Sequence, residues 1–365
     1  MALALIAAAC GGDDADVGRP ADEGQDGGRS NSLPCDPDCT LREAAAAAGI
    51  SVGVHINGDN PEEHIQDLVV DDPVRDLVVR EFDRITNLGV GMAPFQARRG
   101  EYDFAVADAM YDFAAEHGLS THAFHWLWSQ DLLDLNPEWL EAITDPTEMW
   151  TALEDHLAAV VERYPDIDRI NVVNEPMAVA GGALADNLFS SVLGRDYVAE
   201  AIRRADAIAP DYELFVNEVL VEYDQPKAEG YLDLVTGLVE DGVPLDGVGI
   251  QAHLFTGDPD WDVLQWLLEE LDALGVRVAI TELDAPVPKG LPDRFEVQAE
   301  RMARVVELCL SVEACDSVIL WGVHDGNSWL DDFMEPGLDP LVFTRELEPK
   351  PAYDAIRQVL LDHAR

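Results

Sequence analysis

From Leu41 onward, the chain alternates short runs rich in β-branched residues with longer segments whose apolar residues recur every three or four positions. Short apolar runs are typical of strands buried on both faces, and the longer period is typical of amphipathic helices. The predicted strands are Ser51–Ile56, Ile85–Met92, Leu119–Trp126, Arg169–Asn174, Glu213–Asn217, Gly247–Ala252, Val276–Thr281 and Ser317–Val323. The predicted helices between them are Phe104–His117, Met149–Tyr164, Tyr197–Ala209, Ala228–Glu240, Trp261–Leu274 and Phe295–Leu310.

Strands that alternate with helices in this way predict a parallel α/β fold. Gly118, Gly242 and Gly275 follow three of the helices, where glycine commonly ends a helix. A dinucleotide-binding sheet would be expected to carry a glycine-rich phosphate loop after its first strand, and this sequence has none there. The pattern therefore favours a (β/α)8 TIM barrel in a single domain.

Composition divides the chain into three parts. Residues 1–10 form an apolar run that ends in small residues and Cys10, too short to span a bilayer but typical of the end of a signal peptide. The small-small-Cys-Gly sequence resembles a bacterial lipoprotein cleavage site, which predicts lipidation of Cys10 and a protein that is extracellular or anchored to the outer face of the bacterial cell membrane. Residues 11–40, rich in Gly, Asp, Ser and Pro, are expected to form a flexible acidic linker, and residues 41–365 the barrel.

Acidic residues outnumber basic ones by 72 to 23, which gives a formal net charge of -49. This charge would repel nucleic acid and anionic membranes, so contact with a membrane is expected only through a lipid at Cys10. The composition predicts a strongly solvated acidic surface that keeps the protein soluble in concentrated salt.

Four further cysteines form two close pairs, Cys35 with Cys39 and Cys309 with Cys315. An even number of cysteines after an export signal favours disulfides, although buried free thiols would fit the same spacing. Neither pair has the two-residue spacing or the nearby histidines of a zinc site, so no metal is expected.

Polar and aromatic side chains gather at the ends of six predicted strands, and in a barrel these ends share one rim. In chain order they are His122, His125, Trp126, Trp128, Asn174, Glu175, Asn217, Glu218, Gln251, His253, Glu282, Asp284, Trp321, His324, Asp325 and Trp329. Any one of them has an ordinary interpretation as a core indole or a structural histidine, but their coincidence describes a sugar site. Indole faces stack on pyranose rings, and amides and carboxylates bind the hydroxyls. Two facing carboxyl groups, here Glu175 and Glu282, are the minimum equipment for cleaving a glycosidic bond.

Four of these stretches carry a family resemblance. They read Val-Val-Asn-Glu at 172–175, Gly-Ile-Gln-Ala-His-Leu at 249–254, Ile-Thr-Glu-Leu-Asp at 280–284 and Leu-Trp-Gly-Val at 320–323. Together with Ser328-Trp329 and the Lys-Pro-Ala-Tyr at 350–353, they resemble glycoside hydrolase family 10 in order and spacing. The resemblance implies a retaining endo-1,4-β-xylanase that hydrolyses internal β-1,4-xylosidic bonds of xylan by double displacement. It also implies a monomeric barrel that acts on plant cell-wall xylan or its oligosaccharides without a cofactor.

Carried over by position, the resemblance makes Glu175 the general acid/base and Glu282 the nucleophile. Around them, the resemblance implies that Asn174 bonds the sugar 2-hydroxyl, that His253 and Gln251 contact the nucleophile, and that Asp284 supports His253. It implies that Trp321 and Trp329 form the walls of the subsite where the bond breaks. His122 and Trp126 would contact the sugar on the glycone side. The resemblance also implies a disulfide between Cys309 and Cys315 and a supporting role for Glu218.

Two motifs depart from the family pattern. The second strand usually ends in Glu-Asn-x-x-Lys, and this chain has Leu88, Gly89 and Met92 where those polar anchors would stand. The third-strand motif at 122–130 is one residue longer than usual, which loses or displaces its second histidine, and Asp-Gly-Asn at 325–327 replaces the usual Asp-Lys-Tyr. We therefore expect intact catalytic groups and a rebuilt glycone site.

Two alternatives stay open. One is a retaining β-glycosidase of the same fold that acts on β-glucan, decorated xylan or short β-glycosides. The other is a catalytically slow polysaccharide-binding protein, although binding alone would not require both glutamates together with Asn174, His253 and Asp284.

Overall fold

The computed structural model describes residues 38–56, 72–87, 91–129, 136–255, 257–334 and 336–365. Its strands are β1 (Ser51–His55), β2 (Arg84–Asn87), β3 (Ser120–Ala123), β4 (Leu127–Trp128), β5 (Arg169–Asn174), β6 (Glu213–Glu218), β7 (Gly247–Ile250), β8 (Arg277–Leu283) and β9 (Cys315–Leu320). All strand pairs within these residues are parallel, and the sheet closes because β3 pairs with β5. The two-residue β4 pairs with β5 just beyond β3, so β3 and β4 share one of the eight barrel positions. The predicted (β/α)8 barrel is confirmed.

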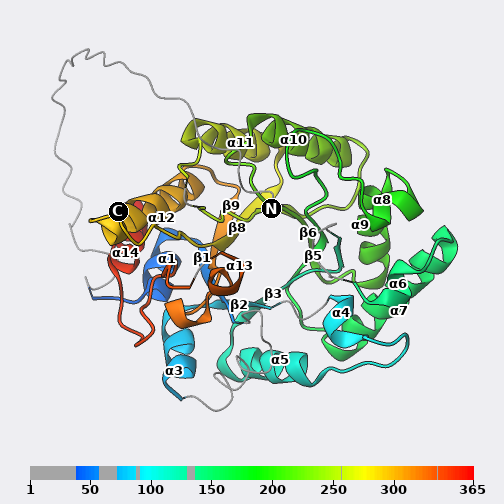
Figure 1. Ribbon diagram of the computed structural model, residues 1–365, viewed down its shortest axis with the longest axis horizontal. Helices are drawn as coiled ribbons and strands as arrows, with labels where there is room; N and C mark the ends of the chain where they lie inside the picture. Colours follow the sequence, from blue (N-terminus) through cyan, green and yellow to red (C-terminus); the bar gives the residue numbers. More distant parts are fainter. Residues whose placement is uncertain (1–37, 57–71, 88–90, 130–135, 256, 335) are drawn as a thin grey trace.

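Helices surround the strands as an outer ring, apart from the short α13 (Leu330–Phe333), which lies inside that ring in Figure 1. The other helices are α1 (Leu41–Ala48), α3 (Asp72–Glu81), α4 (Met92–Phe95), α5 (Ala105–His117), α6 (Glu138–Glu141), α7 (Pro146–Arg163), α8 (Leu188–Leu193), α9 (Tyr197–Ile208), α10 (Gln225–Glu240), α11 (Trp261–Leu274), α12 (Arg294–Leu310) and α14 (Pro351–His363), and a 3-10 turn spans Asp325–Asn327. All six predicted helices are present. Both Gly118 and Gly275 end their helices in the left-handed conformation.

The second strand is shorter than predicted, because it ends at Asn87 and Met92 already begins α4. Met92 is buried in the main hydrophobic core. The first helix, α1, was not predicted. It begins at a capping box in which Thr40 and Glu43 bond each other's backbone N–H groups, and such a box stabilises a short helix start.

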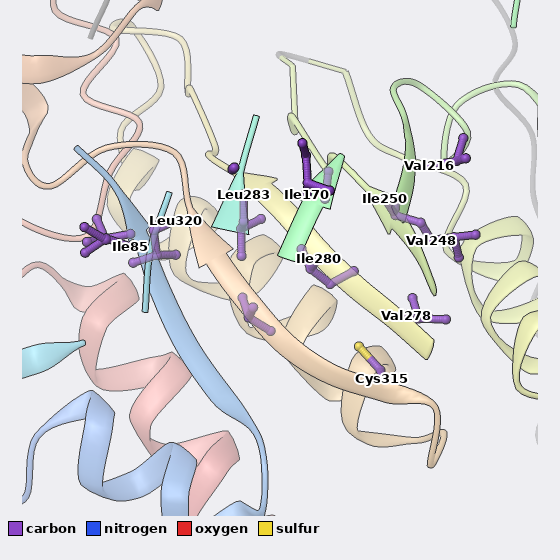
Figure 2. Packing of buried hydrophobic residues seen from close by; sticks show 14 of the residues in the cluster. Ile85, Ile170, Val216, Val248, Ile250, Val278, Ile280, Leu283, Cys315 and Leu320 are labelled. Carbon is purple, nitrogen blue, oxygen red and sulfur yellow. The ribbon is translucent and has the colours of Figure 1, made fainter. Parts of the chain in front are cut away.

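Aliphatic side chains fill the space within the barrel wall and between the wall and the helices. Every residue of β5 is buried, as expected of a parallel strand covered on both faces. Figure 2 shows the packed side chains, from Val278 and Ile280 on β8 to Val248 and Ile250 on β7. Each such side chain contributes about 1.5–3 kcal/mol when it is fully buried.

Charged residues close the end of the barrel where the strands begin. Arg169 opens β5 and contacts Glu213 at 2.7 Å and Asp316 at 2.6 Å, and Arg277 contacts Glu213 at 2.6 Å. Their positions at strand starts leave the opposite end, where the strands finish, available for a functional site.

A disulfide joins Cys309 at the end of α12 to Cys315 at the start of β9, with an S–S distance of 2.03 Å. This pairing is confirmed. Cys10 and Cys35 lie outside the described residues, so the lipidation site and the pairing of Cys35 with Cys39 stay predictions. None of the helices in the described ranges is long and apolar enough to cross a membrane.

Candidate active site

Two glutamates lie at the finishing ends of the strands, as the sequence predicts. Glu282 is on β8, and Glu175 follows the last residue of β5 directly. Both are buried, with Glu175 9% and Glu282 4% exposed. Burial at a barrel rim is the setting in which carboxyl groups can be tuned for acid, base or nucleophilic chemistry.

Glu175 is held in an unusual backbone conformation. Its φ is 52°, in the left-handed region that a residue with a side chain rarely adopts. Its N–H donates to Asn217 O at 2.8 Å, and its Oε1 accepts from Gln251 at 3.0 Å and from Asn174 at 3.3 Å. Ala252, just before His253, has a φ of 59°. Strained backbone of this kind concentrates at functional sites, where surrounding contacts maintain it.

Glu282 has different partners. Its Oε1 accepts from Asn217 Nδ2 at 2.8 Å, and its Oε2 lies 3.1 Å from His253 Nε2. On the other side of the imidazole, Nδ1 lies 3.1 Å from Asp284 Oδ2. Burial raises the pKa of Glu282, while the bonds from His253 and Asn217 oppose that rise.

Two carboxylates flank His253 and favour its protonated form. Burial alone would lower the pKa of His253, but the adjacent carboxylates of Asp284 and Glu282 outweigh it and raise the pKa to about 10. The imidazole is hydrogen-bonded to Glu282 through Nε2 and lies in charge contact with Asp284 through Nδ1. A cation against Glu282 favours its ionised form, which a nucleophile requires.

Asn217 connects the two glutamates; the sequence places it among the strand-end side chains of the expected sugar site but assigns it no role there. Its amide donates to Glu282 Oε1 and to Asn174 Oδ1, both at 2.8 Å, while its own Oδ1 accepts from Thr281 at 2.7 Å. Gln251 also approaches Asn174 Oδ1, at 3.4 Å. All polar atoms of the Asn217 amide are thus engaged, which fixes its orientation. In the sequence, the feature that points to Asn217 as a site residue is its position at the end of a predicted strand, directly before Glu218.

Trp321 and Trp329 lie against this cluster. Trp329 donates its indole N–H to Asp284 Oδ2 at 2.8 Å, and its ring centroid is 5.0 Å from that of His253. Trp321 meets His253 edge to face at 5.9 Å. The structure therefore brings together eight of the predicted site residues: Asn174, Glu175, Gln251, His253, Glu282, Asp284, Trp321 and Trp329.

His122 and Trp126 are not part of this group. His122 is 1% exposed, bonds Asn171 Oδ1 at 2.9 Å through Nε2, and packs on Phe215. Trp126 is 2% exposed, lies in the main core, and donates its indole N–H to Leu153 O on α7 at 3.1 Å. Neither side chain is placed for the glycone contact expected of it.

Trp128 occupies the neighbourhood expected for Trp126. It lies on β4 directly beside Asn174 on β5, and its ring meets His125 edge to face at 5.2 Å. Its indole nitrogen is buried and has no hydrogen-bond partner among the described residues. The physical reason is local: the chain leaves the sheet after Ala123 and rejoins it at Leu127, so the added residue changes which indole faces the site.

Glu218 has its own partners. Its carboxylate contacts Lys227 Nζ at 2.9 Å and accepts from the N–H groups of Met177 at 2.8 Å and Val219 at 2.9 Å. The Glu218 and Lys227 side chains are 0% and 1% exposed. Burial raises the pKa of Glu218 to about 7, with Lys227 opposing the rise. These bonds fit the expected supporting role and leave Glu175 as the candidate acid.

Replacing Lys227 with methionine is expected to destabilise the fold by about 3–5 kcal/mol at pH 8, because a buried carboxylate loses its counter-ion. The loss should be smaller at pH 5. The folded pKa of Glu218 lies above its ordinary value of 4.5, so the stability contributed by its protonated form is present at low pH and is lost as pH rises through 7. Urea unfolding at both pH values measures the difference. The double variant Glu218→Gln/Lys227→Met should recover most of the loss, and an equal loss at both pH values would contradict this account.

Among the described residues, no group of three or more His, Cys, Asp or Glu side chains is arranged to hold a metal ion. What the site offers is two carboxyl groups with unlike surroundings, amides that join them, an imidazole and indoles along the edge.

A TIM barrel with two glutamates at its strand ends has the carboxyl groups that a glycoside hydrolase requires. Comparison with known proteins identifies its family. Residues 40–359 match the profile of glycosyl hydrolase family 10. The chain belongs to this family and is a glycoside hydrolase.

Its relatives include endo-1,4-beta-xylanase B of Thermotoga neapolitana, 29% identical over 72% of this chain and 75% of the relative. Another is endo-1,4-beta-xylanase 2 of Aureobasidium pullulans, 30% identical over 80% of this chain and 84% of the relative. Among solved structures, xylanase 10B of Thermotoga petrophila RKU-1, in complex with xylobiose, superimposes with a TM-score of 0.82 at 26% identity. That match covers 90% of this chain and 99% of the other.

Proposed function

We propose that this protein is a retaining endo-1,4-β-xylanase in which Glu282 is the nucleophile and Glu175 the general acid/base. The observation that carries the assignment is the unlike environment of the two glutamates. Glu282 is bonded to the His253 imidazole and to Asn217, whereas the carboxyl of Glu175 is bonded to the amides of Gln251 and Asn174. The hydrogen bonds from His253 and Asn217 favour the ionised form of Glu282 and oppose the rise in its pKa that burial causes.

In the first step, the Glu282 carboxylate attacks the anomeric carbon while Glu175 gives its proton to the departing glycosidic oxygen. A covalent glycosyl-enzyme forms, and the negative charge of Glu282 is neutralised. Glu175, now ionised, then takes a proton from water, which attacks the anomeric carbon and releases Glu282. We assign to Asn174, which bonds Glu175 directly and reaches Glu282 through Asn217, the hydrogen bond to the sugar 2-hydroxyl that strengthens in the transition state.

Xylan is the substrate that the relatives favour. Both sequence relatives are named endo-1,4-beta-xylanases, and one related structure was solved with xylobiose. The departures from the family pattern concern the glycone side, where Met92 and Trp126 are core residues and Trp128 lies beside Asn174. A β-glucan, a decorated xylan or a short β-glycoside is therefore the alternative substrate.

Reducing-sugar release from xylan, arabinoxylan, mannan and β-glucan, followed by product analysis on defined xylo-oligosaccharides, tests the proposal. We expect release from xylan, with internal cleavage of the oligosaccharides. Release from β-glucan alone would favour the alternative substrate. Binding of xylan without release from any polysaccharide would favour a binding protein instead.

We also propose that the enzyme acts outside the cell or from the outer face of the cell membrane, held there by a lipid at Cys10. The apolar run before Cys10 and the polar linker after it support this location.

A further inference from the structure

The end of β1 carries a histidine that covers Trp321. The strands β1 and β9 pair with Val54 beside Leu320, so the next residues, His55 at the end of β1 and Trp321 just after β9, lie side by side. Their rings stack with centroids 3.9 Å apart and planes 12° apart. His55 is 4% and Trp321 8% exposed. One face of the indole is thus occupied by a ring of the same chain, and a sugar cannot stack on that face.

A second ring lies along Trp321 from β3. Phe124, which is fully buried, stacks on the indole with centroids 5.5 Å apart and planes 25° apart. Phe124, Trp321 and Ile319 form a small cluster separate from the main core, with Trp329 packed against it. His125 stacks on Phe124 at 4.7 Å, and burial holds the pKa of His125 well below its usual range, so this imidazole is neutral. We call the rings of His55, Phe124 and Trp321 the aromatic wall.

The aromatic wall touches the catalytic groups. Trp321 meets His253 edge to face, and His253 in turn contacts Glu282 at 3.1 Å. The wall comes from β1, β3 and β9, the side of the barrel on which Met92 replaces a polar glycone anchor with a core residue. Because Phe124 is fully buried and His55 nearly so, Trp321 is the ring of the aromatic wall that can contact a pyranose.

We propose that His55 is a positioning residue for substrate binding: by stacking on Trp321 it fixes the aromatic wall that contacts the sugar on the non-reducing side of the scissile bond. The inference rests on the proposed function, because it requires a sugar in that place. Its effect is expected in binding, since His55 acts through Trp321 and not on the reacting atoms.

Steady-state kinetics of four variants test the proposal: His55→Ala, His55→Phe, Trp321→Ala and the double variant His55→Ala/Trp321→Ala. We expect His55→Ala to raise KM about three- to tenfold with kcat changed less than about twofold, as removal of one aromatic contact would do. The His55→Phe variant keeps a stacked ring and should keep KM within about twofold of the unmodified enzyme. In the Trp321→Ala background, His55→Ala should add no further change.

Tyr102→Ala is the matched control, because it removes a ring stacked on Phe104 at 5.3 Å and 2° in the outer layer. Its KM should be unchanged. An unchanged KM in His55→Ala, failure of His55→Phe to restore binding, or independent addition of the His55 and Trp321 effects would overturn the inference. The variants are compared on whichever polysaccharide the unmodified enzyme cleaves. If that polysaccharide is not xylan, the proposed substrate is corrected, and the KM values still test the role of His55.

Discussion

Replacing Glu282 with alanine is expected to lower kcat on xylan by about 10⁴-fold or more, which corresponds to about 5.5 kcal/mol of lost transition-state stabilisation. The reason is that the glycosyl-enzyme forms on this carboxylate, and two neighbouring carboxylates are held by other groups: Asp284 by His253 and Trp329, and Glu218 by Lys227. The measurement is steady-state hydrolysis of xylan and of an aryl β-xyloside.

Adding azide distinguishes the loss of a nucleophile from a general loss of activity, because azide can act as a nucleophile in place of the missing carboxylate. In Glu282→Ala, azide can enter the space left by the carboxyl group and attack the anomeric carbon, while Glu175 still protonates the leaving oxygen. The product should be a glycosyl azide of inverted configuration, because only one displacement occurs. The exposed Glu162 on α7 offers a matched control, since Glu162→Ala should behave as the unmodified enzyme with or without azide. Normal turnover by Glu282→Ala would refute the assignment.

The barrel and its two glutamates could be predicted from the sequence because both depend on local patterns. Buried parallel strands produce runs of β-branched residues, and a strand end fixes which residue reaches the rim. Glu175 and Glu282 each follow such a run, so their meeting required only that both strands belong to one sheet. The structure brings them to the same rim.

The indole beside Asn174 could not be predicted in the same way. Alternation along a strand assigns side chains to faces only while the chain stays in the sheet, and a shift of one residue exchanges the two faces. Because the chain leaves the sheet between Ala123 and Leu127, Trp126 turns into the core and Trp128 lies at the site.

Long-range partners were also hidden from the sequence. Asn217 bonds side chains 43 and 65 residues away, and the stack of His55 on Trp321 joins the first strand of the barrel to the last. Nothing in the neighbourhood of either residue in the chain indicates its partner. Closure of the sheet creates these contacts, and only the folded chain displays them.

Replacing Glu175 with alanine is expected to produce a different defect from that of Glu282→Ala. Hydrolysis of xylan should fall by about 10²–10⁴-fold, because the departing sugar oxygen then leaves without a proton. A substrate with a good leaving group, such as a dinitrophenyl β-xylobioside, needs no such help and should still form the glycosyl-enzyme at close to the normal rate. Azide should then attack that intermediate and give a glycosyl azide of retained configuration, since two displacements have occurred.

The variant Glu175→Gln tests whether the defect comes from lost proton transfer or from a lost side chain, because the amide preserves the size of the side chain but cannot transfer a proton. It should match Glu175→Ala on xylan, and recovery of xylan hydrolysis by glutamine would mean that Glu175 supports the site without acting as the acid.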